Sequence, residues 1–92
     1  MNSLCKGILK LLYIKEAFDE DSALLLGEIR RSIIEQRNRM RQALTYLLGN
    51  NYICSANISA EQRKSRTVDA KTGSLMYYLT TFGKEYVEEE LA

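Results

Sequence analysis

The fold is decided by residues 36–51, which read QRNRMRQALTYLLGNN. At about 100° per residue, the apolar side chains of this segment fall on one face, which predicts an amphipathic helix over 36–49. The following Gly49-Asn50-Asn51 holds residue types that tolerate a left-handed backbone, so we expect the helix to end there. The buried face of the predicted helix is formed by Met40, Ala43, Leu44, Leu47 and Leu48.

The opposite face of the same helix is polar and basic. With Met40 at 0°, the side chains of Asn38, Gln42 and Thr45 lie at about 140–200°. Arg39 and Arg41 flank them at about −100° and +100°. Amide side chains can bond adenine edges, and arginine can bind guanine or phosphate, so this stripe is typical of a helix that reads the major groove. The alternative is a solvated helix face, although such a face usually mixes charges of both signs.

Positive charge is concentrated in two segments. Residues 30–41 carry five arginines against Glu35 alone, and residues 61–71 carry four cations against two acids. The net charge of the whole chain is only +1, so the remainder is acidic. Two basic segments on an acidic protein predict one surface for a polyanion. The candidate DNA contacts are Arg30, Arg31, Arg37, Asn38, Arg39, Arg41, Gln42, Thr45, Arg63, Lys64 and Arg66.

Two groups of these cations have a second interpretation. Arg30 and Arg31 lie near the end of the preceding predicted helix, where they contact phosphate or satisfy the last carbonyl groups of that helix. The cations at 63–66 either touch a minor groove or the DNA backbone, or form a charged and soluble loop.

Helical periodicity also predicts the elements before residue 36. We expect a first helix over 3–18 with Ser3 as N-cap, a polar break at 19–22, a second helix over 23–33 and a turn at 33–35. The first helix has a wide apolar arc that includes Ile14 and leaves Ala17 outward. Such an arc indicates either a tightly wrapped small core or a face that meets a second copy.

After residue 51 the pattern changes. Residues 52–58 and 75–79 are compatible with strands, and Asp69–Gly73 is a good hairpin turn. The strand at 75–79 pairs with 62–68 or with 52–58, and we expect a long hairpin that includes both. Tyr77 and Tyr78 point to opposite faces of a strand, so one of them is expected in the core. A last helix follows, capped by Thr80 or Thr81.

Composition excludes several classes of protein. The 92 residues suffice for one domain over 1–92, and a hydrophobic content of 46% argues against disorder. The chain has no histidine, and Cys5 and Cys54 lie too far apart in sequence for a zinc motif, so we expect free thiols. A redox switch or an intersubunit disulfide is the alternative for these two cysteines. The carboxylates at 16–21 and 85–90 are expected to be solvated.

Several expectations about chemistry and location follow from the same composition. With no phosphate-binding glycine loop and no nucleophile motif, we expect no enzyme, no cofactor and no metal. No apolar run reaches the length of a membrane span, and the N-terminal residues lack a signal-peptide pattern, so we expect a cytoplasmic protein.

Three pieces of the chain resemble winged-helix DNA-binding regulators of the MarR and PadR type. Leu26–Ile29 resembles the start of the first helix of their helix-turn-helix, and Arg41–Ile53 resembles their recognition helix running into the first wing strand. Tyr77–Gly83 matches the pattern Tyr-x-Leu-Thr-x-x-Gly at the entry to the final helix. The resemblance implies an α+β winged helix-turn-helix with a three-helix core, a β-hairpin wing and a C-terminal helix. The segment between Tyr52 and Leu79 is longer than usual, which implies an enlarged wing.

The resemblance and the charge pattern together predict a sequence-specific transcriptional regulator that binds double-stranded DNA. We expect a homodimer through the first and last helices, with helix 36–49 in the major groove and residues 59–73 on backbone or minor groove. No small-molecule effector is indicated. One alternative is a winged-helix module whose basic face binds an acidic protein. Another is an accessory DNA-binding factor in the replication or partition of a mobile element.

Overall fold

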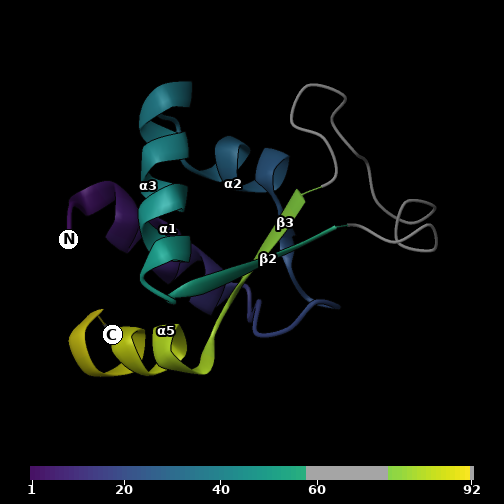
Figure 1. Cartoon of the computed structure of the whole chain (residues 1–92), viewed down its shortest axis with the longest axis vertical. Helices are drawn as coiled ribbons and strands as arrows, with labels where there is room; N and C mark the ends of the chain where they lie inside the picture. The colour runs from purple at the N-terminus through teal and green to yellow at the C-terminus, as the bar shows by residue number, and fades with distance from the viewer. Residues whose placement is uncertain (58–74, 92) are drawn as a thin grey trace.

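The computed structural model describes residues 1–57 and 75–91, and it combines helices with one small sheet (Figure 1). The sheet is antiparallel, with the strand order β1-β3-β2. The elements in chain order are α1 (Ser3–Ile14), β1 (Leu24–Leu25), α2 (Leu26–Ser32), α3 (Arg37–Gly49), β2 (Ile53–Asn57), β3 (Leu75–Leu79), α5 (Thr81–Tyr86) and η1 (Val87–Leu91).

Helix α3 follows the sequence prediction closely. Met40, Ala43, Leu44 and Leu47 are buried, and Leu48 is half-buried, so the predicted apolar face is the one that packs on the core. The helix ends at Gly49, and Asn51 takes the left-handed conformation with φ 64°. Asparagine tolerates this conformation better than most residues, which explains the stop at the predicted place.

Helix α1 differs from its prediction at both ends. Its N-cap is Asn2 and not Ser3, because the Asn2 side chain accepts a hydrogen bond of 2.9 Å from the Cys5 N–H. The helix stops at Ile14 and not at residue 18, since Glu16 adopts a left-handed φ of 56°. The chain therefore turns back, which buries Ala17 and leaves Ile14 73% exposed, the reverse of the expected arrangement.

The second predicted helix begins later than expected. Leu24 and Leu25 form the short strand β1, paired with Tyr77 and Met76 of β3. The Glu28 carboxylate accepts a hydrogen bond of 3.0 Å from the Leu25 N–H and so holds the start of α2. A helix over 23–33 was wrong for residues 23–25 because their pairing partner lies about fifty residues further along the chain, beyond the reach of local periodicity.

Strand β3 occupies the predicted residues and pairs with β2 from Ile53↔Leu79 to Asn57↔Leu75. Of the two pairings considered, the one with 52–58 is therefore present, and residues 62–68 and the turn at 69–73 lie outside the described residues. Tyr77 is buried and Tyr78 half-buried on the other face, as their alternation predicts.

A junction of polar contacts joins the end of α3 to the start of α5. Thr80 caps α5, because its Oγ1 accepts the Gly83 N–H at 2.9 Å and donates to the Asn51 carbonyl at 2.6 Å. The Thr80 N–H donates to the Tyr52 carbonyl at 3.1 Å. The Tyr52 ring stacks on Phe82, with ring centres 5.0 Å apart. The cap is thus Thr80, one of the two predicted candidates.

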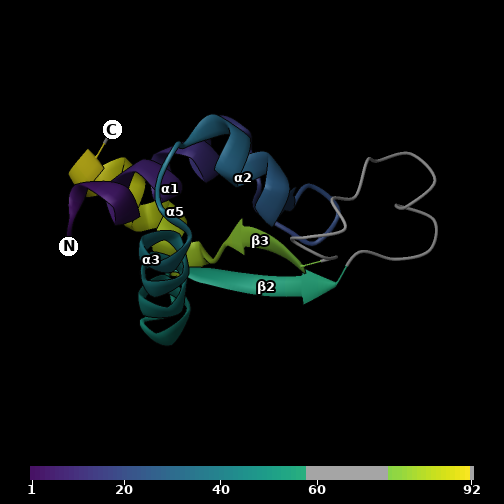
Figure 2. The same ribbon diagram turned by 90° about the horizontal axis from the view of Figure 1, so that it is seen from above.

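These elements form a winged helix-turn-helix of the α+β class, as the sequence predicts. Helices α2 and α3 are joined by the short turn at 33–36, and α1 lies beside the C-terminal helix α5–η1 (Figure 2). The larger of two core clusters joins α1, α2, α3, the strands β2 and β3 and η1, and Ala23, Leu25 and Met76 form the smaller one. Among the described residues, no polar or charged side chain is buried. Cys5 and Cys54 are free thiols, and burial raises the pKa of the Cys5 thiol.

The junction gives a test of the fold with a matched control. A methyl group at Gly83 would meet the carbonyl oxygen of Tyr52 and lie 2.9 Å from its carbon, whereas one at Gly49 would meet no heavy atom within 4 Å. We expect Gly83→Ala to lower the free energy of unfolding by about 1–3 kcal/mol. Gly49→Ala should leave it unchanged or raise it by up to about 1 kcal/mol. Urea denaturation of both variants measures the difference, and equal effects would contradict the close approach at Gly83.

Candidate nucleic-acid interface

The polar face of α3 is exposed along its whole length. The predicted contact residues of this helix are all exposed, namely Arg37, Asn38, Arg39, Arg41, Gln42 and Thr45. Because the helix is anchored by its buried face, these side chains are presented on a rigid element rather than on a loop. Their exposure is confirmed, and their contact with DNA remains a prediction.

The N-terminal end of α3 is unusual in its electrostatics. Its first turn holds no acidic residue, and the N-cap Gln36 provides no side-chain cap. Arg37 and Arg39 therefore stand at the positive end of the helix dipole, where cations are unfavourable. The backbone N–H groups of such an end, together with the arginines, are complementary to an anion.

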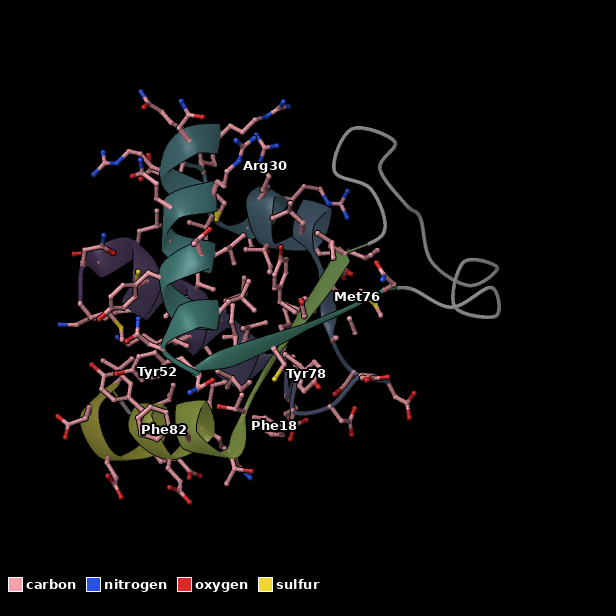
Figure 3. The ribbon with its side chains drawn as sticks, in the orientation of Figure 1. Phe18, Arg30, Tyr52, Met76, Tyr78 and Phe82 are labelled. Atoms are coloured by element: carbon pink, nitrogen blue, oxygen red, sulfur yellow. The ribbon has the colours of Figure 1, made fainter. Side chains whose placement is uncertain are left out.

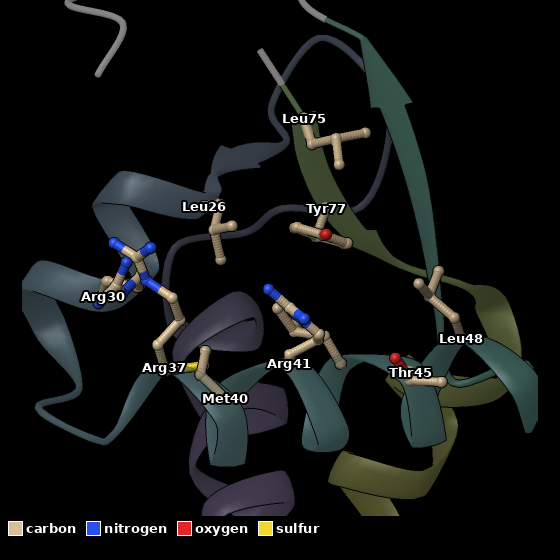
Figure 4. Close-up of a pocket in the computed structure, with 10 residues that line it drawn as sticks. Leu26, Arg30, Arg37, Met40, Arg41, Thr45, Leu48, Leu75 and Tyr77 are labelled. Carbon is tan, nitrogen blue, oxygen red and sulfur yellow. The ribbon is translucent and has the colours of Figure 1, made fainter. Parts of the chain in front are cut away.

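One side of α3 borders a cavity of about 260 Å³ between α2, α3 and β3 (Figure 4). The cavity brings together Arg30 of α2 with Arg37, Arg41 and Thr45 of α3, four of the predicted residues. Burial raises the pKa of the Tyr77 phenol at its edge, so this group stays neutral near pH 7. The described residues that line it are Leu26, Arg30, Arg37, Met40, Arg41, Leu44, Thr45, Leu48, Leu75 and Tyr77.

The other side of α3 borders a separate groove. Arg39, Gln42 and Tyr46 line it together with Met1, Asn2, Leu4, Cys5 and Ala43. Asn38 lines neither depression and is exposed. The exposed polar face of α3 is thus a ridge that has the cavity on one side and the groove on the other.

The two neighbouring arginines of α2 are separated by the fold. Arg30 is half-buried and lines the cavity, whereas Arg31 is exposed and lies in another depression with Lys15 and Glu28. Both stand in the last turn of α2, where cations also stabilise the negative end of the helix dipole. The predicted contacts Arg63, Lys64 and Arg66 lie outside the described residues.

Charge is separated along the molecule. Figure 3 shows nitrogen-tipped side chains around the start of α3 and near Arg30, and oxygen-tipped side chains along the C-terminal helix at the opposite end. The described carboxylates at 16–21 and 85–90 are exposed, as predicted. A polyanion is therefore attracted to the α3 end and repelled from the α5 end, which orients its approach.

Sequence reasoning did not find the apolar walls of the cavity. Leu48 lies at about 80° on the helical wheel, between Arg37 at about 60° and Arg41 at about 100°, so its place beside the arginines could have been read from the sequence. Leu26 and Tyr77 come together only through the pairing of β1 with β3, which leaves no local signal. Tyr46, 45% exposed in the groove, shares the flank of Arg39 and could also have been found on the wheel.

The described residues offer little for other kinds of site. Within them, no group of three or more His, Cys, Asp or Glu side chains could hold a metal ion. None of the helices that the structure describes has both the length and the apolar character needed to cross a membrane.

Comparison with known proteins reveals a likeness in structure but not in sequence. No protein-family model matches the chain, and no curated protein matches it. The structure is similar to that of TubR from Bacillus megaterium pBM400, with a TM-score of 0.79 and 18% sequence identity, covering 97% of this chain and 84% of that chain. The likeness supports the winged helix-turn-helix and adds nothing in favour of the MarR or PadR type.

Proposed function

We propose that this protein is a transcriptional regulator that binds double-stranded DNA in a sequence-specific manner, with α3 in the major groove. The observation that carries the proposal is the exposed, basic and uncapped N-terminal half of α3. The fold supports it, because a helix-turn-helix presents its second helix at the surface in this way. A fold by itself hosts several functions, so the assignment rests on the side chains of α3.

The dimensions and chemistry of α3 suit a major groove. Its 13 residues span about 20 Å, and the groove is about 12 Å wide, enough to admit one helix. Asn38 and Gln42 are assigned to base edges, because their amides can donate and accept at once. Arg39 and Arg41 are assigned to guanine or phosphate, and Arg30 to phosphate.

We also propose a homodimer through α1 and the C-terminal helix. Most of the apolar arc of α1 is used by its own core, where Cys5, Ile8, Leu9 and Leu12 are buried. The dimer proposal is therefore supported by the C-terminal end of this helix, where the apolar side chain of Ile14 remains exposed. A two-fold dimer would place two α3 helices on half-sites about 34 Å apart.

The role of α3 is tested by selection of bound sequences from a random duplex pool. We expect one preferred sequence, and Gln42→Ala should lower discrimination at one base pair by about 1–3 kcal/mol because an amide–base contact is lost. Asn38→Ala should act in the same way at another position. Binding to non-specific duplex should barely change, since neither variant removes a charge.

A variant of the core distinguishes, in the same assay, a loss of base recognition from a loss of folding. Leu44→Ala should lower the free energy of unfolding by about 2–5 kcal/mol through a cavity and weaken binding to every sequence alike. If Gln42→Ala and Asn38→Ala keep the affinity and base preferences of the unaltered protein, α3 is not the reading helix. No preference among duplexes, with binding lost at physiological salt, would favour an acidic protein as the partner.

The segment at 59–73 is predicted to add affinity more than specificity. Replacing Arg63, Lys64 and Arg66 by alanine removes up to three phosphate contacts. The slope of log K against log salt should then become shallower by about 0.9 per contact, or about 2–3 units in all. Preference among sites should hardly change. An unchanged slope would show that these cations do not touch DNA.

The dimer is tested by sedimentation with two matched isoleucine variants. The unaltered chain should sediment at twice 10.6 kDa at micromolar concentration. Ile14→Asp should give a monomer, because a charge at the proposed interface opposes its desolvation. Ile34→Asp, at a residue 95% exposed in the turn before α3, should remain dimeric. A monomer of the unaltered chain that persists at high concentration and on DNA would contradict the proposal.

A further inference from the structure

The groove on the side of α3 away from the cavity lies between this helix and the start of α1 (Figure 2). Two of the residues that line it, Cys5 of α1 and Ala43 of α3, are buried. The Cys5 thiol donates a hydrogen bond of 4.0 Å to the Ala43 carbonyl, so the two helices are joined beneath the groove. Because both sides belong to packed helices, the groove exists before any partner arrives.

The described lining of this groove carries positive charge and no negative charge. Arg39 is exposed on the α3 side, and none of the described residues that line the groove is acidic. The first turn of α1, on the opposite side, holds no acidic residue either. The groove therefore attracts a negatively charged partner more strongly than a neutral or positive one.

Tyr46 continues the flank of α3 on which Arg39 stands. It lies at about −120° on the helical wheel, beside Arg39 at about −100°. Tyr46 follows Arg39 by seven residues, which is about 10 Å along the helix axis. Its side chain is 45% exposed and lines the groove. Tyrosine is common at interfaces because its ring packs while its hydroxyl bonds a polar partner, so this position is suited to a contact.

We propose that the groove holds the sugar–phosphate backbone of one DNA strand, with Arg39 and the Tyr46 hydroxyl bound to two phosphates of that strand. The inference rests on the proposed function, because the strand is one that borders the major groove in which α3 is proposed to lie. Phosphate oxygens accept hydrogen bonds from tyrosine hydroxyls as well as from arginines. Gln42, assigned to a base edge, lines the same groove between these two residues, so backbone and base contacts are continuous.

The two phosphate contacts should respond differently to salt. Arg39 neutralises a phosphate and so releases counterions from the duplex. The Tyr46 hydroxyl carries no charge, so it bonds a phosphate without releasing them. Its contribution to affinity should therefore not depend on salt, and it should be the same for every base sequence, since a backbone contact carries no sequence information.

Tyr46→Phe tests the contact, because it removes the hydroxyl and keeps the ring. Fluorescence anisotropy should show affinity for the selected duplex falling about tenfold per bound chain, since a hydrogen bond to a charged group is lost. The slope of log K against log salt and the base preferences should not change. Arg39→Gln should also lower affinity, but with a slope shallower by about 0.9.

Tyr52→Phe is the matched control. It makes the same change just beyond the end of α3, at a half-buried tyrosine that lines neither the groove nor the cavity. It should alter affinity for the duplex by less than about twofold. Urea denaturation should show that Tyr46→Phe and Tyr52→Phe are both as stable as the unaltered chain, which separates a lost contact from a loss of folding.

Uncharged methylphosphonate groups identify the phosphate itself. Each phosphate of the selected duplex is replaced in turn, at the matching position of every half-site. At the phosphate that Tyr46 contacts, Tyr46→Phe and the unaltered chain should bind equally tightly, because the partner of the hydroxyl is already altered. At every other position the difference of about tenfold should remain. A difference that persists at all positions would overturn the proposal.

The outcomes distinguish this inference from the function proposed above. If one sequence is preferred but Tyr46→Phe binds it as tightly as the unaltered chain, the DNA-binding function stands and the backbone contact fails. Relaxed base preference in Tyr46→Phe would also overturn the contact, because the hydroxyl would then read a base. If all duplexes bind alike and Tyr46→Phe weakens each of them with an unchanged salt slope, the contact stands and sequence-specific regulation fails. Binding of no duplex overturns both.

Discussion

The close approach of Gly83 to the carbonyl group of Tyr52 fixes how α3 stands relative to the sheet. The same carbonyl accepts the Thr80 N–H, and the Thr80 hydroxyl holds the carbonyl of Asn51 just after α3. The end of α3, the start of β2 and the start of α5 thus meet at one point. Strand β3 runs into this junction and carries Tyr77, so the cavity wall and the exposed face of α3 are positioned by it. A side chain larger than that of glycine would separate these parts.

Helix α3 carries charges that lower its own stability. Arginine near a helix N-terminus costs roughly 0.3–1 kcal/mol at an exposed position, and the first turn of α3 holds two. Burial of Met40, Leu44 and Leu47 on the other face contributes about 1.5–3 kcal/mol for each side chain, which outweighs that cost. Burial of the apolar face therefore stabilises α3 enough to offset the cost of its N-terminal arginines. Local conflicts of this kind are expected where a surface serves a partner.

Features set by residues close together in the sequence could be predicted from it, and features set by residues far apart could not. The apolar face of α3 and the stop after Gly49 depend on neighbours within a few residues, and the structure confirms them. It also confirms the residues predicted for β3 and one of the two predicted caps, Thr80. Strand β1 and the burial of Ala17 depend on contacts with Tyr77 and Leu79, which lie far along the chain. The cavity depends on the same distant pairing. The exposed polar face of α3 was therefore predictable, and the cavity beside it was not.

In the proposed DNA-binding surface, the exposed face of α3 separates two kinds of contact. Gln42 and Arg39 stand on the flank of the groove, and Arg37 and Arg41 on the flank of the cavity. Of the cations beside the cavity, Arg30 is assigned to phosphate and Arg41 to guanine or phosphate, whereas the amides of Asn38 and Gln42 are assigned to base edges. Phosphate contacts set affinity and base contacts set preference, so Arg30 would contribute equally to binding of all duplexes. It would also make the salt dependence steeper, since more counterions are released when more phosphates are neutralised. The half-buried position of Arg30 on α2 thus ties affinity to the packing of α2 against α3, while the amides that would set preference stand on the exposed face of α3.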